Sequence, residues 1–458
     1  MKEKTMNMGQ GSVLSVLLTL GLPAMVSMFF QNLYSLVDTV FVSWLGTVEL
    51  AALSLSIPLL YFAMSVAKGL AVGTTALVSH ARGGNEEGRA GMIIASSLPL
   101  ALVAIAPFCL IAFTLVNQWV FGLFNVDPNV LPEIDKFVFW LAWIFPAMGF
   151  TMLCEGVFLS YGDAKTPMMA MIAGNLMNMI LDPFFIFVCN MGIAGASLSS
   201  FIGWTLAGII MWTALKRRGK DRPGFGVSTG HLRFWKPIAW AGGPVALAMM
   251  VIPFSLVGLN YVLAPFGPAF VGAWNLSSRM EQMIVLPLYG LSCSLIPFAG
   301  FNLGAGNADR IREAVRISFT ACYGILVPTG LLLWLFAPDI IGLFNPGSEV
   351  LKLSSFALRV ALVGYFLVPA ELIMSGLAQG IKKPQYSLVT NLLRLLCLRL
   401  PLAFVFGHIW GGQGAYVSHT VSMVITGIVS LFIIHRLMGL MDTARDPNCE
   451  TALCGQTT

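Results

Sequence analysis

The residues of this chain that could do chemistry are carboxylates and other oxygen-bearing side chains inside long apolar segments. Two sets stand out: Gln31, Tyr34, Ser35 and Asp38 in one segment, and Asn175, Asn178 and Asp182 in another. Within each set the members lie three or four residues apart, so one face of a helix would carry them. Two acids with carboxamides and hydroxyls would suit Na⁺, or would share a proton, because close carboxylates cannot both ionise at low cost. The alternative is a hydrogen-bonded packing network between helices, in which Ser and Asn are common.

Further charged side chains lie in apolar segments of both halves: Lys68, Glu155, Arg279, Glu281, Arg359, Glu371, Arg394 and Arg399. Acids outnumber bases in the first half and bases outnumber acids in the second, so a cation would be drawn to the first half. The alternative is structural pairing, as between Arg279 and Glu281, or extension of the charged ends to a membrane interface. Lys68 has no such partner nearby in the sequence.

Two other features concern shape. Pro23 removes a helix hydrogen bond fifteen residues before Asp38 and would place a bend there, which could change with the charge of Asp38. The segment 166–188 is rich in Met, which suits varied apolar ligands. The alternatives are a static kink and Met side chains that only pack or face lipid. Seven residues from both halves of the chain are candidates for the lining of a substrate cavity: Gln31, Tyr34, Glu155, Met171, Asn175, Arg279 and Glu281.

Several function classes find no support in the sequence. It has no phosphate-binding loop, no nucleophile–base pair and no His, Cys or Glu set with metal-ligand spacing, so we expect neither an enzyme nor an ATP-driven pump. No basic stretch interleaved with aromatic residues suggests a nucleic-acid surface. The eight cysteines are scattered singly, and the five histidines lie mainly at expected helix ends. No cofactor is expected beyond a coupling ion, Na⁺ or H⁺.

The elements that must position these residues are membrane-spanning helices. Of 458 residues, 57% are hydrophobic and 10% charged, against about 25% charged in soluble domains. About 20 apolar residues cross a bilayer, and helices satisfy their backbone groups internally. We expect twelve spans, and therefore an all-α membrane protein: 12–43, 49–79, 91–117, 134–161, 166–188, 192–215, 237–263, 269–302, 314–337, 355–380, 385–408 and 412–437.

Basic residues in the loops predict the orientation. Loops on one side hold 19 Lys and Arg residues and loops on the other hold two, Lys136 and Lys352. Because basic loops stay in the cytoplasm, both termini are expected there, in the inner membrane of a bacterial cell. The first span is too long for a cleavable signal peptide.

The chain also repeats itself. Five pairs of segments recur in the same order and at nearly one separation: GLPA (21–24) and GGPV (242–245), RGGN (82–85) and GAGN (304–307), FGLFN (121–125) and IGLFN (341–345), GDAKTP (162–167) and GIKKP (380–384), and MGIAGA (191–196) and WGGQGA (410–415). This predicts two parallel six-helix lobes, 1–222 and 223–458, a basic linker at about 216–236 and a short C-terminal tail. Paired repeats are a recurring transporter architecture.

The motifs resemble those of the multidrug and toxic compound extrusion (MATE) family. The resemblance rests on the two sets of six spans, on P-A-x-V-x-x-x-x-Q-x-L-Y-x-x-V-D at 23–38, on G-D-A-K-T-P at 162–167 and on N-x-x-x-x-x-L-D-P at 175–183. It implies export of organic, often cationic, compounds in exchange for Na⁺ or H⁺, by a protein that is expected to be monomeric and to contact membrane lipids.

The resemblance is greatest to the branch of the DNA-damage-inducible F proteins. In that branch Asp38, Asn178 and Asp182 would bind the cation, Ser200 would add a hydroxyl, and Pro23 would bend the first helix. The other main branch uses acids in spans seven and ten, whereas span seven here has none and Glu371 is not at the corresponding place. The alternative function is flipping of a lipid-linked saccharide by a member of the same superfamily, which Arg394 and Arg399 would suit.

Overall fold

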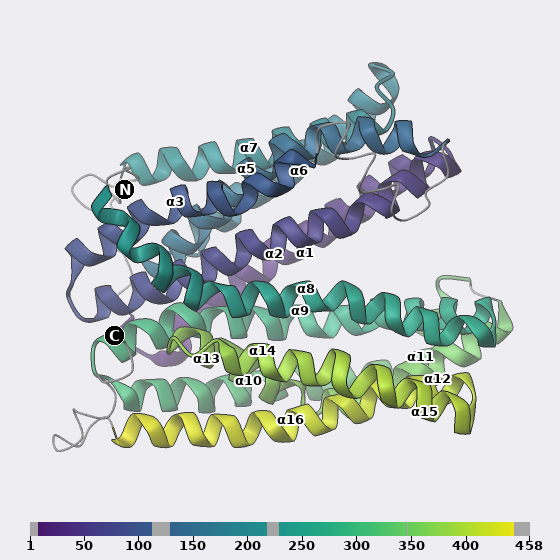
Figure 1. The fold of residues 1–458 in the computed structure, drawn as a ribbon. Helices are drawn as coiled ribbons and strands as arrows, with labels where there is room; N and C mark the ends of the chain where they lie inside the picture. Colours follow the sequence, from purple (N-terminus) through teal and green to yellow (C-terminus); the bar gives the residue numbers. More distant parts are fainter. Residues whose placement is uncertain (1–7, 112–128, 218–228, 346, 444–458) are drawn as a thin grey trace. The chain divides into compact units, whose positions relative to one another are not determined.

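The computed structural model describes residues 8–111, 129–217, 229–345 and 347–443, and these residues form helices and no strands. Figure 1 shows helices running side by side within each half of the chain. The expected all-α fold is therefore confirmed. The segment FGLFN at 121–125, most of the expected linker and the C-terminal tail lie outside the described residues.

The helices of the first half follow the expected spans closely. They are α1 (Val13–Ser43), α2 (Thr47–Gly83), α3 (Glu87–Leu110), α5 (Leu131–Ser160), α6 (Lys165–Pro183) with the π-helix η1 (Phe184–Val188), and α7 (Ile193–Arg217). A 3₁₀ turn, η3 (Thr229–Phe234), then leads into α8 (Trp235–Leu263).

The second half continues from α8 through the 3₁₀ turn η4 (Ala264–Phe266). Its helices are α9 (Pro268–Gly304), α10 (Ala308–Leu335), α11 (Ala337–Gly342), α12 (Ser348–Tyr365), α13 (Val368–Gly380), α14 (Gln385–Leu392), the π-helix η5 (Leu393–Leu398), α15 (Arg399–Trp410) and α16 (Gly412–Thr443). Among the described residues eleven helices are long and apolar enough to cross a membrane. The helices α12 and α13, bent by 53° at the break between them, make a twelfth if the pair is counted as one span, so the described residues give eleven or twelve spans against the expected twelve. The short α11 was not expected.

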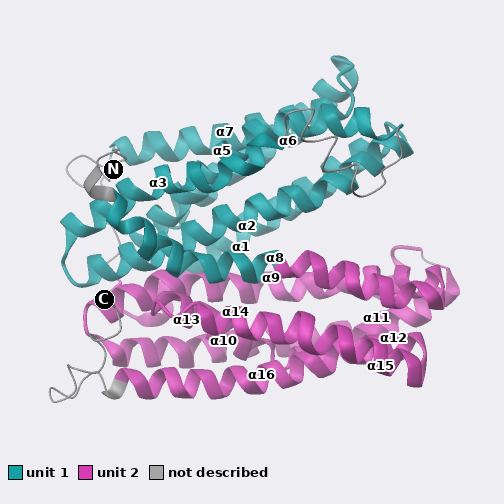
Figure 2. Ribbon diagram, in the orientation of Figure 1, with its two compact units in different colours: residues 1–7, 19–250 teal, residues 8–18, 251–458 magenta. Residues whose placement is uncertain are grey.

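Two compact units divide the chain, as Figure 2 shows. Unit 1 comprises residues 1–7 and 19–250, and unit 2 comprises residues 8–18 and 251–458. Helices α1 and α8 therefore each contribute to both units. The sequence repeat predicts two lobes with a boundary after residue 222. The two compact units divide within α8 instead, so the two lobes stay a prediction.

The start of α1 is held in unit 2 by hydrogen bonds to the backbone. Arg310 of α10 donates to the carbonyl oxygens of Gly11 at 3.1 Å and Gln10 at 3.3 Å. Asn302 donates to the carbonyl oxygen of Met8 at 3.2 Å, and Met8 is completely buried. The segment before α1 is thus fixed to α9 and α10, whereas α1 from Thr19 onward belongs to unit 1.

Residues with a left-handed backbone recur with the repeat. Four pairs of them occupy corresponding places in the two halves: Gly46 and Gly267, Asn85 and Gly306, Gly162 and Lys382, and Asn190 and Gly411. The turn after α2 shows the shared geometry, since the amide of Glu86 donates to Ala81, five residues back, as the amide of Asn307 does to Asn302 after α9. Such a left-handed C-cap ends a helix sharply. The two halves thus end corresponding helices with the same local backbone device.

Close packing of α6 on α7 in unit 1 depends on two glycines. An added Cβ at Gly174 would lie 2.5 Å from the carbonyl oxygen of Gly203, and one at Gly203 would lie 2.7 Å from that of Gly174. Small residues let membrane helices approach closely where lipid gives them no hydrophobic drive to associate. The contact brings the polar residues of α6 within reach of those of α7.

We expect Gly203→Ala to lower the midpoint of thermal unfolding of the purified protein in detergent. The added methyl group must push α7 away from α6, and overpacking of this kind costs about 1–3 kcal/mol. The matched control is Gly324→Ala in α10, where an added Cβ meets no atom within 4 Å. That variant should be neutral or slightly stabilised, because Ala favours a helix over Gly by about 1 kcal/mol. Equal midpoints for the two variants would contradict the assigned contact.

Candidate cation site

Asp182 is the most deeply buried acid of unit 1. It lies near the C-terminal end of α6 and is completely buried. Its Oδ1 accepts a short hydrogen bond from the hydroxyl of Ser199 on α7. Its Oδ2 is also buried and has no hydrogen-bond partner within the described part of the chain. One carboxylate oxygen is therefore fixed and the other is unsatisfied.

Asn178 lies one helical turn before Asp182 on α6 and also faces α7. Its side-chain amide donates to the hydroxyl of Ser200 at 2.9 Å and lies 3.5 Å from that of Ser199. Its Oδ1 is buried and unpaired in the described residues. The two serines thus take the amide hydrogens of Asn178 and leave its oxygen available to another ligand.

Asp38 brings a second carboxylate to this region from α1. It is half-buried, and its Oδ1 has no partner among the described residues. The charges of Asp38 and Asp182 interact, and the hydroxyl of Tyr34, one turn earlier on α1, is within electrostatic range of both. The two acids that the sequence places in different spans are therefore within electrostatic range of each other.

A small cavity of about 10 Å³ lies in unit 1; Asn178 lines it, whereas Asp38 and Asp182 are not among its lining residues. Its lining comes from α1, α6 and α7: Tyr34, Met171, Gly174, Asn175, Asn178, Ser200, Gly203, Trp204 and Ala207. The volume is about what one water molecule needs. An ion or a water fits such a space, and an organic compound does not.

The arrangement suits a monovalent cation or a proton. Asp38 on α1 and Asn178 and Asp182 on α6 each have a buried side-chain oxygen with no hydrogen-bond partner among the described residues. Carboxylate and carboxamide oxygens are hard ligands. Two negative charges close together in an apolar region are also costly, and a bound cation or proton would relieve that cost. In the described residues no group of three or more His, Cys, Asp or Glu side chains could hold a metal ion.

The remaining candidate residues of the first half are more scattered. Gln31 is half-buried on α1, one turn before Tyr34, and Pro23 lies inside a continuous α1. Glu155 of α5 forms an ion pair with Lys68 of α2 at 3.1 Å, with about a quarter of each side chain exposed. Lys68 thus has a partner distant in sequence, and Glu155 is engaged in a helix–helix contact.

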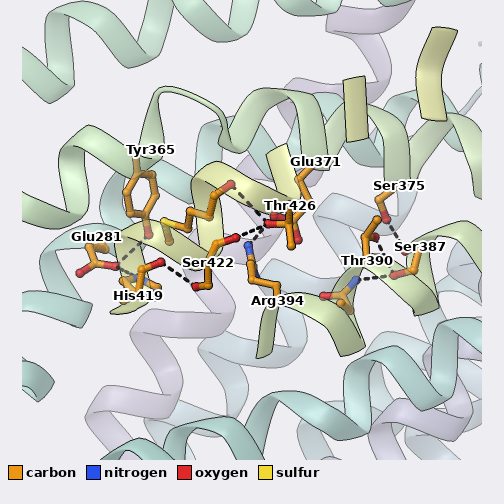
Figure 3. Close-up of polar contacts among 12 residues, drawn as sticks. Glu281, Tyr365, Glu371, Ser375, Ser387, Thr390, Arg394, His419, Ser422 and Thr426 are labelled. Carbon is orange, nitrogen blue, oxygen red and sulfur yellow. Dashed lines mark hydrogen bonds and ion pairs between the residues drawn. The ribbon is translucent and has the colours of Figure 1, made fainter. Parts of the chain in front are cut away.

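In the second half Arg279 and Glu281 do not pair. Arg279 is exposed on α9, whereas Glu281 is 4% exposed and is hydrogen-bonded by Tyr365 of α12 and His419 of α16 (Figure 3). Two residues apart on a helix, the side chains point to different faces. The expectation that the histidines lie mainly at helix ends is wrong for His419, which is buried inside α16.

Sequence reasoning missed three residues of these clusters: Ser199, Tyr365 and His419. Ser199 adjoins Ser200 in the sequence, and alternate Ser residues at 197 and 199 mark that part of α7 as polar. The sequence did not identify Tyr365 and His419 as members of a cluster, because their partner Glu281 on α9 is 84 and 138 residues away in the sequence.

Comparison with known proteins shows the family to which the chain belongs. The sequence model of the MatE family matches the chain twice, at residues 23–184 and 244–405. The separation of the two matches is that of the paired left-handed residues, such as Gly46 and Gly267. Together they cover more than half of the chain.

Individual relatives agree with this match over nearly the whole chain. A protein of Shewanella oneidensis described as an FAD transporter is 28% identical over 434 residues, covering 92% of this chain and 94% of the relative. A probable multidrug resistance protein of Thermotoga maritima, NorM, is 23% identical, with 91% and 90% covered. The crystal structure of the MATE transporter VcmN of Vibrio cholerae shares the fold at a TM-score of 0.88 and 23% identity, with 93% and 97% covered. The chain therefore belongs to the MatE family, whose members are multi-pass membrane transporters and not enzymes.

Proposed function

We propose that this protein is a secondary active exporter of organic compounds, driven by inward movement of Na⁺ or H⁺ at the site of Asp38, Asn178 and Asp182. The observation that carries the proposal is the set of buried, unpaired oxygens on these three side chains. A buried oxygen without a donor is costly, and acids inside membrane helices commonly mark ion pathways. The protein would work in the bacterial inner membrane with both termini in the cytoplasm, as the basic loops favour.

Binding of the cation at this site would act on α1. Asp38 lies on the part of α1 that belongs to unit 1, whereas the start of α1 is fixed to unit 2 by Arg310 and Asn302. A change in the charge of Asp38 therefore acts on a helix that both units hold. Pro23, between the two attachments, interrupts the hydrogen-bond ladder and provides a place for bending. This supports antiport by alternating access.

The names of the relatives bear on the exported compound. Those named for multidrug resistance support a range of organic compounds as substrates, and the relative described as an FAD transporter supports a flavin nucleotide as a second candidate. The Met residues of α6, among them the buried Met171, suit varied apolar groups of either substrate.

The proposal is tested with purified protein in proteoliposomes. We expect efflux of a fluorescent organic cation, or of FAD, to follow an imposed Na⁺ gradient or an imposed pH gradient, and the effective gradient identifies the ion. Asp38→Asn should abolish this efflux, because a neutral carboxamide removes the charge that binds the cation.

Two other outcomes of the efflux assay would contradict the proposal. An Asp38→Asn protein that exports against a gradient at the wild-type rate would refute the coupling role of Asp38. Transport of neither compound under either gradient would refute the proposal in favour of another cargo, and lipid-linked saccharides should then be tried.

A second prediction concerns the serine that fixes Asp182. Ser199→Ala removes the hydrogen bond to Oδ1, and a hydrogen bond to a charged group contributes about 1.5–3 kcal/mol. We expect the coupling cation to be required at a concentration on the order of tenfold higher for half-maximal efflux. The control is Ser197→Ala, since the equally buried hydroxyl of Ser197 bonds only the carbonyl oxygen of Ala194 in its own helix. A similar shift in both variants would show that Ser199 acts only through helix packing.

A further inference from the structure

Unit 2 contains a second buried cluster of titratable groups that the proposed cation site does not use. Figure 3 shows it between α9, α12 and α16. Glu281 is its centre: Oε1 accepts from Ser277 at 3.1 Å, and Oε2 accepts from Tyr365 at 3.0 Å and lies 3.1 Å from Nε2 of His419. All four side chains are more than nine-tenths buried. The carboxylate is therefore surrounded by donors from three helices.

The imidazole of His419 has one nitrogen in use and one without a partner. Because an ionised carboxylate only accepts hydrogen bonds, Nε2 carries the hydrogen when Glu281 is charged, and Nδ1 then presents a lone pair. Nδ1 is buried and has no hydrogen-bond partner in the described part of the chain. A network that served only to hold helices together would be expected to satisfy its buried nitrogens.

The surrounding charges balance when His419 is neutral. Arg399 of α15 acts electrostatically on Glu281 and His419, and its guanidinium lies 4.9 Å from the ring centre of Trp274. Arg394 of η5 also acts on His419 and is itself paired with Glu371 of α13 at 2.8 Å; both arginine charges oppose a positive charge on His419, whereas the carboxylate of Glu281 favours it. Two acids and two arginines thus cancel, and one added proton gives the cluster a net charge of about +1.

The cluster is not a copy of the cation site in unit 1. Its central acid, Glu281, lies on α9, which follows α8 in the second half as α2 follows α1 in the first, whereas the acids of the cation site lie on α1 and α6. The oxygens of Glu281 are already occupied by donors, which leaves no shell for Na⁺, whereas a proton needs none.

We propose that Glu281 and His419 form a second proton-binding site, which takes up one proton in each transport cycle. The proton adds to Nδ1 of His419, whose Nε2–H stays hydrogen-bonded to Glu281, and no bond other than N–H forms or breaks. A carboxylate and an imidazole in contact titrate as a pair, so both are needed. That this site takes part in transport rests on the proposed ion-driven export. That it binds a proton does not rest on that proposal.

Proton binding is tested first without transport, on the full-length protein in detergent. The ring of Trp274 stands edge-on to that of His419, with centroids 5.0 Å apart, and a protonated imidazole quenches indole fluorescence. We expect a fall in tryptophan fluorescence on acidification, within the range of about pH 4 to 8 in which protein histidines titrate. The fall should be lost in His419→Gln and in Trp274→Phe. The same pH response in wild type and both variants would overturn the site.

The role in the cycle is tested in proteoliposomes by counting protons carried per exported substrate. Glu281→Gln and His419→Gln should each carry one proton fewer than the wild type. Tyr365→Phe is the control, since it removes a hydrogen bond to the same Oε2 without removing a group of the pair, and it should keep the wild-type ratio.

The two tests separate this inference from the proposed function. Unchanged proton numbers in both pair variants, alongside the loss of transport in Asp38→Asn, would overturn the second site and leave the proposed function standing. A fluorescence step that depends on His419, in a protein that no ion gradient drives, would retain the proton site and reject the coupling.

Discussion

The cost of keeping a carboxylate inside a membrane helix governs the arrangement of this protein. Each intramembrane acid needs donors or counter-charges, because neither lipid nor apolar side chains solvate it. Unit 2 meets this need from within, since Glu281 and Glu371 are surrounded by hydroxyls, an imidazole and arginines. Unit 1 meets it only in part. Ser199 holds one oxygen of Asp182, and the other oxygen and one of Asp38 have no donor in the described residues. In the proposed function, this pair of acids with unsatisfied oxygens would take up a positive charge.

Packing between helices decides which polar groups can meet. The hydroxyls of Ser199 and Ser200 reach α6 because the backbones of Gly174 and Gly203 touch where a larger residue would separate them. In unit 2 the bend of 53° between α12 and α13 divides one span into two pieces. Tyr365 is the last residue of the first piece and Glu371 lies in the first turn of the second. The break therefore lets one span supply a partner to each of two neighbouring ion clusters.

Much of this architecture could be predicted from the sequence, because its physical causes are local. Twelve apolar segments had to become helices, and helices α1 and α6 carry Asp38 and Asp182 where the pattern placed them. The partners of the buried charges could not be predicted in the same way. Lys68 meets Glu155 87 residues later, and Glu281 meets His419 138 residues later. Which face of a helix meets which neighbour depends on packing between helices that are distant in the sequence, and the sequence pattern of one helix does not specify it. The broken span was hidden for a similar reason, since Phe366 and Leu367 are apolar residues within a long apolar run.

Helix α1 belongs to both units, because residues 8–18 lie in unit 2 and the helix from Thr19 onward lies in unit 1. Its start is held in unit 2 by hydrogen bonds that Arg310 and Asn302 donate to backbone carbonyl oxygens, and Asp38 lies near its other end. Sequence repetition alone would have produced two independent lobes, each with its own acids. Instead the buried acids of the second half, Glu281 and Glu371, lie on α9 and α13, where Tyr365, His419 and Arg394 pair with them. The two units therefore differ in how they satisfy buried carboxylates: those of unit 2 have donors or counter-charges, whereas Asp38 and Asp182 of unit 1 each keep an oxygen with no partner among the described residues.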